Sequence, residues 1–287
     1  MNSPDRKPWW LYPNLLSLDA PLVSVAWLYV FAKTWRLGYH QWEAYACLGL
    51  VVWIIYATDR LLDVSISTSM PGARVEPRHE FHARHRGKFR LGIILAGVTA
   101  LVLLFTRLPY AIFSYLLLGG VLVAGFFGMS LLTNRESGEV PYAKNVLAGA
   151  TFAFGTAMTA HLYRGEYGIQ EMVISKEFLC FAVLCILNIS AIDLWEHATA
   201  ARDNETRAFD EIALTLPLLL LGGASLMLAL RDEQQTARPF FYAILTGAAL
   251  LYVLNRNRAR FPLDGLRVLA DCAVLAPVLV FVAARGA

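Results

Sequence analysis

The sequence contains few charged residues for its length. Asp, Glu, Lys and Arg together make up 16% of the 287 residues, whereas about a quarter of an ordinary soluble domain is charged. Hydrophobic residues make up 57%, and the mean hydropathy is +0.50. This composition disfavours a soluble domain and predicts an integral membrane protein.

Cysteine is scarce as well, and the net charge is small. The four cysteines lie inside long apolar stretches at spacings that do not match a metal site. We therefore expect neither a disulfide framework nor a cysteine-bound metal. The formal net charge of +3 is spread along the chain, which disfavours nucleic acid as a partner. The expected surroundings are a lipid bilayer.

Long apolar runs occur throughout the sequence. A bilayer core of about 30 Å is crossed by a helix of about 20 apolar residues. Several links between the runs are short, so we predict an all-α bundle of nine transmembrane helices in a single membrane domain, residues 1–287. Cap loops are expected at about 64–90, 133–140 and 198–211. The predicted spans are 14–35, 40–63, 91–107, 110–132, 141–163, 175–197, 212–231, 239–256 and 263–284.

The distribution of Lys and Arg predicts the orientation of these spans. With the N-terminus in the cytoplasm, fifteen basic residues lie in the cytoplasmic tail and connections, against eight on the opposite side. Cytoplasmic loops of membrane proteins carry the excess of positive charge. We therefore expect an inner or plasma membrane protein whose N-terminus is cytoplasmic.

Two pairs of acidic residues lie near the cytoplasmic ends of predicted spans. Asp59 and Asp63 are four residues apart in the second span, and Asp193 and Glu196 are three apart in the sixth. Each spacing puts both carboxylates on one helix face, where they repel unless a cation lies between them. Mg²⁺ binds one or two carboxylates together with phosphate oxygens. The pairs therefore predict Mg²⁺ ions that bridge a diphosphate and stabilise its departure.

Other polar residues gather at the same predicted face. Arginines in the loops after the acidic spans can bind phosphate oxygens that the metals leave free. A structural explanation stands beside this one, because basic cytoplasmic loops also orient membrane proteins and bind anionic lipid. Ionisable residues within spans are nevertheless functional candidates by default. The candidate substrate-binding residues are Tyr142, Asn188, Trp195, Arg78, Arg84 and Arg202, and Lys144 is a further candidate catalytic residue.

The ninth span carries charges of opposite sign. Asp264 and Arg267 are three residues apart, and Arg267 and Asp271 are four apart, so all three share a helix face. An ion-pair ladder satisfied within the helix is the simpler interpretation of this set.

The placement of the acidic pairs resembles the UbiA superfamily of intramembrane prenyltransferases. That family has nine helices with acidic motifs on the second and sixth. Its first motif is Asn, Asp three residues on and Asp four further, which Asp59 and Asp63 match while Tyr56 replaces the Asn. In the second motif Asp193 and Glu196 match, and Ala200 occupies the third acidic place. Tyr142 and Lys144 loosely match a Tyr and a Lys near the start of the fifth helix.

The resemblance implies a Mg²⁺-dependent enzyme that ionises an isoprenyl diphosphate. Asp59, Asp63, Asp193 and Glu196 would be the metal ligands, and Tyr56 joins them among the candidate catalytic residues. Most members pass the prenyl group to a lipophilic aromatic or lipid acceptor, and some cyclise it. We slightly favour a terpene cyclase, since aromatic faces stabilise carbocations. Rings at plausible depth are Trp53, Phe126, Phe127, Phe152, Phe154, Tyr163 and Trp195.

A function of another class stays open. Acids within a membrane also serve as cation or proton sites in transporters, and the chain could be a transporter or a lipid-binding protein. Against this, the acids gather at one face of the membrane rather than near the midplane of the bilayer.

Overall fold

The computed structural model describes residues 8–38, 40–69, 77–132, 141–165, 168–201 and 203–286, with the side chains of 66–69, 77–80 and 132 excepted. Within this part the chain is mostly helical and contains no β-strand, as the sequence predicted. The chain folds as two compact units, and each is described by itself. Unit 1 comprises residues 1–25 and 41–108, and unit 2 comprises residues 26–40 and 109–287.

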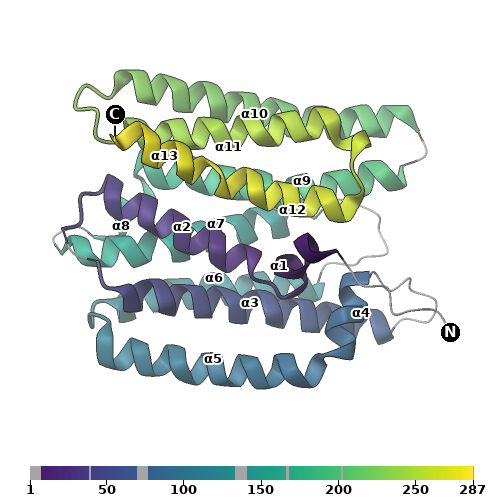
Figure 1. The fold of residues 1–287 in the computed structure, drawn as a ribbon, viewed down its shortest axis with the longest axis horizontal. Coiled ribbons are helices and arrows are strands. Elements are labelled where there is room, and N and C mark those ends of the chain that lie inside the picture. The colour runs from purple at the N-terminus through teal and green to yellow at the C-terminus, as the bar shows by residue number, and fades with distance from the viewer. Residues whose placement is uncertain are drawn as a thin grey trace. The chain divides into compact units, whose positions relative to one another are not determined.

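Unit 1 contains the first acidic pair. Its elements are η1 (Trp9–Leu11), α1 (Tyr12–Leu15), the start of α2 (Asp19–Thr34), α3 (Trp42–Ser69), α4 (Pro77–Arg84) and α5 (Arg86–Arg107). α5 packs along α3, and α4 packs against the end of α3 (Figure 1). Much of the segment expected as a cap loop at 64–90 is helical, because α3 continues to Ser69, α4 occupies 77–84 and α5 begins at Arg86.

Unit 2 contains the second acidic pair and the larger core. After the remainder of α2 come α6 (Ile112–Leu132), α7 (Tyr142–His161), η3 (Leu162–Arg164), α8 (Ile169–Val173), α9 (Lys176–Ala200), α10 (Asn204–Arg231), α11 (Arg238–Asn257), η4 (Arg258–Arg260), α12 (Leu263–Leu275) and α13 (Pro277–Gly286). α9 packs against α7, α10, α11 and α12. The expected cap loop at 198–211 shrinks to residues 201–203, and the one at 133–140 lies outside the described residues.

Aromatic rings fill the core of unit 2 near the start of α9. The Trp27 ring lies 4.6 Å from that of Phe181, and the Phe31 ring lies 5.2 Å from that of Phe240. The Trp27 indole nitrogen donates to the Val274 carbonyl at 2.8 Å, which satisfies a polar group that burial would otherwise penalise. α12 and α13 meet there, where Pro277 ends the regular helix and divides the predicted span 263–284.

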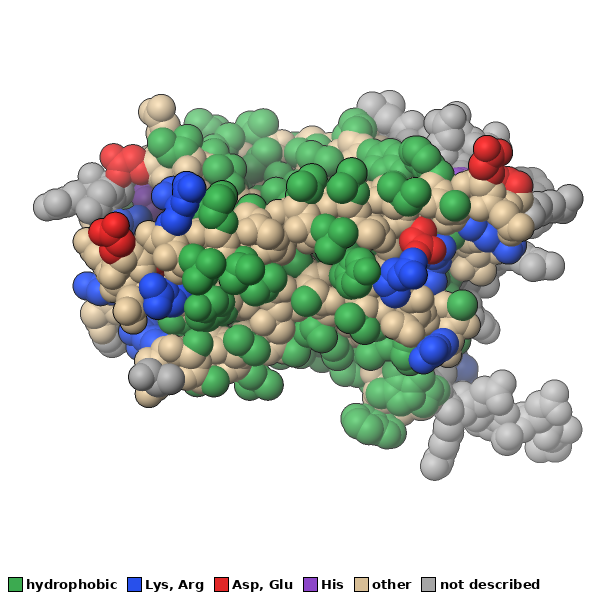
Figure 2. Space-filling model, turned by 90° about the horizontal axis from the view of Figure 1, so that it is seen from above, with side chains coloured by type: hydrophobic (Ala, Val, Ile, Leu, Met, Phe, Trp, Pro, Cys, Tyr) green, Lys and Arg blue, Asp and Glu red, His purple; other side chains and the backbone are tan. Residues whose placement is uncertain are grey.

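Among the described residues, six helices are long and apolar enough to cross a membrane: α5, α6, α9, α10, α11 with η4, and α12 with α13. A seventh results if η1 and α1 are counted with α2 as one bent span. Figure 2, which looks down on α10 and α11, shows hydrophobic side chains along their middle and charged side chains toward both ends. The chain is thus an integral membrane protein by these helices. The predicted count of nine is not confirmed, since α3 and α7 are not among them.

Candidate functional site

α9 carries four of the predicted site residues, Asn188 at its middle and Asp193, Trp195 and Glu196 near its C-terminal end. α9 begins at a Ser175 cap, whose hydroxyl accepts from the Phe178 amide at 3.2 Å, and runs for 25 residues without proline or glycine. Asp193 and Glu196 share a face near its end, as the sequence predicted. Trp195 lies on a different face and is 1% exposed. Its indole nitrogen donates to Asn255 Oδ1 of α11 at 2.9 Å, so the ring belongs to the packing between α9 and α11.

A buried arginine neutralises Glu196. The Arg267 side chain of α12 is 4% exposed and binds Glu196 Oε1 through two nitrogens, Nη2 and Nε, the latter at 3.1 Å. Its remaining nitrogen, Nη1, donates to Asp264 Oδ1 at 3.1 Å. The ion pair predicted between Asp264 and Arg267 is confirmed, and it extends across helices to Glu196. Because Nη2 and Nε of Arg267 both bind Oε1, Oε2 is the Glu196 oxygen that would contact a bound cation.

A histidine next to Glu196 belongs to the same end of unit 2. His197 Nδ1 lies 2.8 Å from Asp210 Oδ2 on α10, and the Asp210 side chain is 3% exposed. The carboxylate accepts, so Nδ1 carries the hydrogen and the tautomer of His197 is fixed. Sequence reasoning did not single out either residue. The signal was present in the sequence, because His197 follows Asp193 by four residues and so lies on its face.

α7 brings Tyr142 and Lys144 to this end. Tyr142 is 47% exposed at the first position of the helix and lies within electrostatic reach of the Asp210 carboxylate. Lys144 Nζ lies over the Phe126 ring of α6, 5.7 Å from its centroid. The sequence prediction that α7 opens at the same end as the acids of α9 is thereby supported within unit 2.

Two asparagines present unsatisfied polar atoms where α7 and α9 meet. A Cβ at Gly149 would lie 2.6 Å from the Ile186 backbone, so these helices approach closely. Asn145 is 2% exposed, and its amide nitrogen has no hydrogen-bond partner among the described residues. The same holds for the buried amide oxygen of Asn188. Buried polar atoms without a partner are uncommon and indicate a ligand or an ordered water. Asn188 was predicted, and Asn145 was missed.

The first acidic pair lies on α3 in unit 1. Asp63 is 9% exposed, and Tyr56 and Asp59 are half-buried on neighbouring turns. Arg84 is exposed at the end of α4. Arg78 lies on α4 with its side chain outside the described atoms, and Arg202 lies outside the described residues.

A magnesium site is not assembled within either unit as described. Among the described residues, no group of three or more His, Cys, Asp or Glu side chains gathers closely enough to hold a metal ion. Asp59 and Asp63 belong to unit 1, whereas Asp193 and Glu196 belong to unit 2. The predicted ligands thus number two carboxylates in each unit, and Mg²⁺ takes one or two when phosphate oxygens and waters supply the rest.

The chain was compared with known proteins at three levels. No protein-family model, curated protein or solved structure matches it. The resemblance to the UbiA superfamily therefore remains a prediction from the placement of short motifs.

Proposed function

We propose that the protein is a Mg²⁺-dependent membrane enzyme that ionises an isoprenyl diphosphate. The proposed fold is a UbiA-like bundle of nine transmembrane helices, and α3 and α7 are two of them. The proposed active site opens toward the cytoplasm. The observation that carries the proposal is the network at the end of α9, where Glu196 binds the buried Arg267, His197 binds the buried Asp210, and Asp193 shares a helix face with Glu196 and His197. Burying such groups costs free energy, and membrane proteins retain them mainly at functional sites.

The unit 2 residues have distinct tasks in this reaction. Lys144 and Tyr142 line the mouth with a cation and a hydroxyl, which suit phosphate oxygens. The unsatisfied amide atoms of Asn145 and Asn188 offer a donor and an acceptor to the diphosphate or its waters. Arg267 holds Glu196 in one orientation. Bound Mg²⁺ would supply Lewis-acid stabilisation of the departing diphosphate.

The bond between the allylic carbon and the diphosphate oxygen breaks with both electrons leaving on oxygen. In the cyclase, a double bond of the same chain attacks the resulting carbocation, and the final cation loses a proton or adds water. Cyclisation is the favoured outcome, because aromatic rings stabilise a carbocation. Phe126 and Phe127 on α6 are half-buried near Lys144, and their ring centroids lie 5.2 Å apart.

Prenyl transfer to a lipophilic aromatic or lipid acceptor is the second candidate. The burial of Trp195 favours transfer over cyclisation. The Trp195 ring is bound to Asn255 within the helix packing, so it does not line a cavity in which a carbocation would be stabilised. A transporter or lipid-binding protein is the alternative of another class.

Product analysis distinguishes these functions. The purified protein is incubated with Mg²⁺ and geranyl, farnesyl or geranylgeranyl diphosphate without acceptor, and the extract is analysed by mass spectrometry. We expect a cyclic hydrocarbon or alcohol. Diphosphate release that requires an aromatic or lipid acceptor would establish transfer instead. Absence of release with every chain length, with or without acceptor, would contradict the enzyme altogether.

A further inference from the structure

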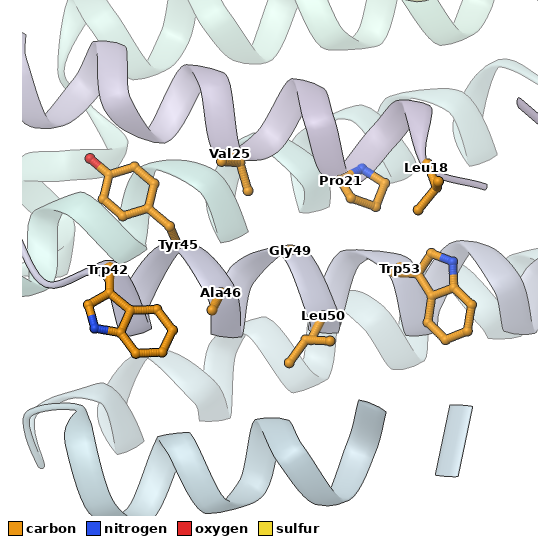
Figure 3. A pocket seen from close by; sticks show the side chains of 9 residues that line it. All are labelled: Leu18, Pro21, Val25, Trp42, Tyr45, Ala46, Gly49, Leu50 and Trp53. Atoms are coloured by element: carbon orange, nitrogen blue, oxygen red, sulfur yellow. The ribbon is translucent and has the colours of Figure 1, made fainter. Parts of the chain in front are cut away.

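An apolar groove runs along unit 1 between α2 and α3 (Figure 3). Small residues, Ala46 and Gly49, form part of its α3 wall, and a tryptophan stands at each end of that wall. Trp42 and Trp53 are eleven residues apart, which is about 16 Å along a helix. Trp42 is 67% exposed, so the groove is open rather than enclosed. The lining residues are Leu18, Pro21, Val25, Trp42, Tyr45, Ala46, Gly49, Leu50 and Trp53.

The Trp53 end of the groove adjoins the first turn of α5. The Trp53 ring stacks on that of Phe89 with centroids 6.4 Å apart. A Cβ at Gly92 would lie 2.9 Å from the Trp53 ring, so α5 approaches it closely. The Trp53 indole nitrogen donates to the Leu16 carbonyl at 2.9 Å, which fixes the ring against the segment before α2.

Positive charge gathers at this end. Arg60 follows Trp53 by seven residues and so lies on the same face of α3, two turns beyond the groove. α5 runs antiparallel to α3, and Phe89 of α5 contacts Trp53 of α3. The residues that precede Phe89 on α5 therefore lie beside the residues that follow Trp53 on α3. Arg86 and Lys88 are exposed there. Neither these two residues nor Arg60 makes a hydrogen bond or ion pair with a side chain in the described part of the chain.

We propose that the α2–α3 groove binds one acyl chain of an anionic membrane phospholipid whose phosphate is held by Arg60, Arg86 and Lys88. The groove supplies an apolar trough for the chain, and the tryptophans bound it at both ends. The cations supply the charge complement, since basic residues beside a membrane attract anionic headgroups. The open side of the groove lets a lipid enter laterally, which suits a bilayer phospholipid better than a molecule sequestered for reaction. The lipid site does not depend on the proposed reaction, although Arg60 directly follows the candidate metal ligand Asp59 in the sequence.

Native mass spectrometry of the full chain in detergent tests this site. Dioleoyl phosphatidylglycerol and dioleoyl phosphatidylcholine, which share their acyl chains, are added at equal concentration. We expect the anionic lipid to be retained more tightly, and Arg60→Gln to weaken its binding about fivefold with little effect on phosphatidylcholine. Arg107→Gln, an exposed arginine at the other end of α5, is the charge control and should bind as the wild type does.

Filling the groove tests the chain-binding half of the proposal. Gly49→Leu should reduce retention of both phospholipids, whereas Gly97→Leu, on α5 with open space around its Cβ, should not. If Gly49→Leu does not fold, Ala46→Leu replaces it. Equal retention of the two lipids by the wild type, or wild-type retention by both Arg60→Gln and the groove variant, would overturn the proposal. Displacement of phosphatidylglycerol by equimolar geranylgeranyl diphosphate would assign the groove to a prenyl substrate instead.

Discussion

At the scale of single residues, the interaction that most changes the interpretation of the sequence is the one between Arg267 and Glu196. The sequence predicted Glu196 as a metal ligand and Arg267 as the partner of Asp264 within one helix. The structure joins the two sets, because Arg267 lies between both carboxylates and is almost fully buried. A buried charge that loses its partner is strongly destabilising.

Arg267→Met should therefore destabilise the folded protein by about 1.5–3 kcal/mol, because Glu196, which is 29% exposed, loses its charged hydrogen-bond partner. The measurement is denaturant unfolding of the purified protein in detergent, followed by circular dichroism. Adding Glu196→Gln to Arg267→Met should restore part of the loss. A single variant as stable as the wild type would show that the ion pair does not hold α9 and α12 together.

The N-terminal cap of α10 should make the stability of the first turn of this helix depend on pH. Asp203 is exposed at the N-cap, and its hydrogen bonds with Thr206 hold the pKa of its carboxyl below the usual range. Because the folded pKa is the lower one, the stabilisation is present above the unfolded pKa and is lost as pH falls through the folded pKa. The protection of the Thr206 amide from hydrogen exchange, taken relative to the intrinsic rate at each pH, should fall at acidic pH in the wild type. Asp203→Asn should remove that dependence. Identical pH profiles in the two proteins would contradict this cap.

At the scale of helices, the closest approach lies between α7 and α9. Gly149→Ala should destabilise the protein by about 1–3 kcal/mol, because the added Cβ would meet the Ile186 backbone, which cannot move without shifting α9. Gly155→Ala on the same helix is the matched control, since nothing lies within 4 Å of a Cβ there. The control should be neutral or slightly stabilising, because alanine favours helix more than glycine. Thermal unfolding of both variants decides this, and equal midpoints would refute the close packing.

Helix positions were largely predictable from the sequence, whereas helix ends and partners were not. Apolar runs of about 20 residues located α5, α6, α9, α10 and α11, since a span needs that length. Hydropathy missed α4 and the first turns of α10, where helices continue through polar sequence. It also merged α12 with α13, and the first predicted span, 14–35, runs from inside α1 into α2 although the helices on either side of that break are bent by 80°. Ser17, which has a positive φ of 56°, lies at that break.

The candidate site was predictable in outline, because the spacing of residues along a helix determines which of them share a face. The i,i+3 spacing of Asp193 and Glu196 puts both carboxylates on one face whatever surrounds α9. The partner of Glu196, Arg267, lies 71 positions further along on α12, and the partner of the neighbouring His197 is Asp210 on α10. No local sequence pattern connects these residues. Asn145 and Asn255 could not be found either, because their importance comes from burial against neighbouring helices.

At the scale of the whole molecule, the charge distribution predicts which ends of the helices face the cytoplasm. Single cysteines at Asp203 and Gln235, in a variant whose four native cysteines are replaced, lie at opposite ends of α10. Asp203→Cys should react with a membrane-impermeant maleimide from the cytoplasmic side only, and Gln235→Cys from the other side only. The reverse labelling would invert the predicted orientation, and labelling of both from one side would contradict a spanning α10.

The central claim concerns the two acidic pairs, which the proposed reaction requires together. The most direct measurement is Mg²⁺-dependent diphosphate release from geranyl, farnesyl or geranylgeranyl diphosphate by the wild type, Asp59→Ala, Asp193→Ala and the control Glu177→Ala, at the opposite end of α9. We predict release by the wild type and the control, and loss of at least a hundredfold in each Asp variant with an unchanged circular dichroism spectrum. Wild-type release by either Asp variant would contradict the claim that diphosphate release requires both acidic pairs.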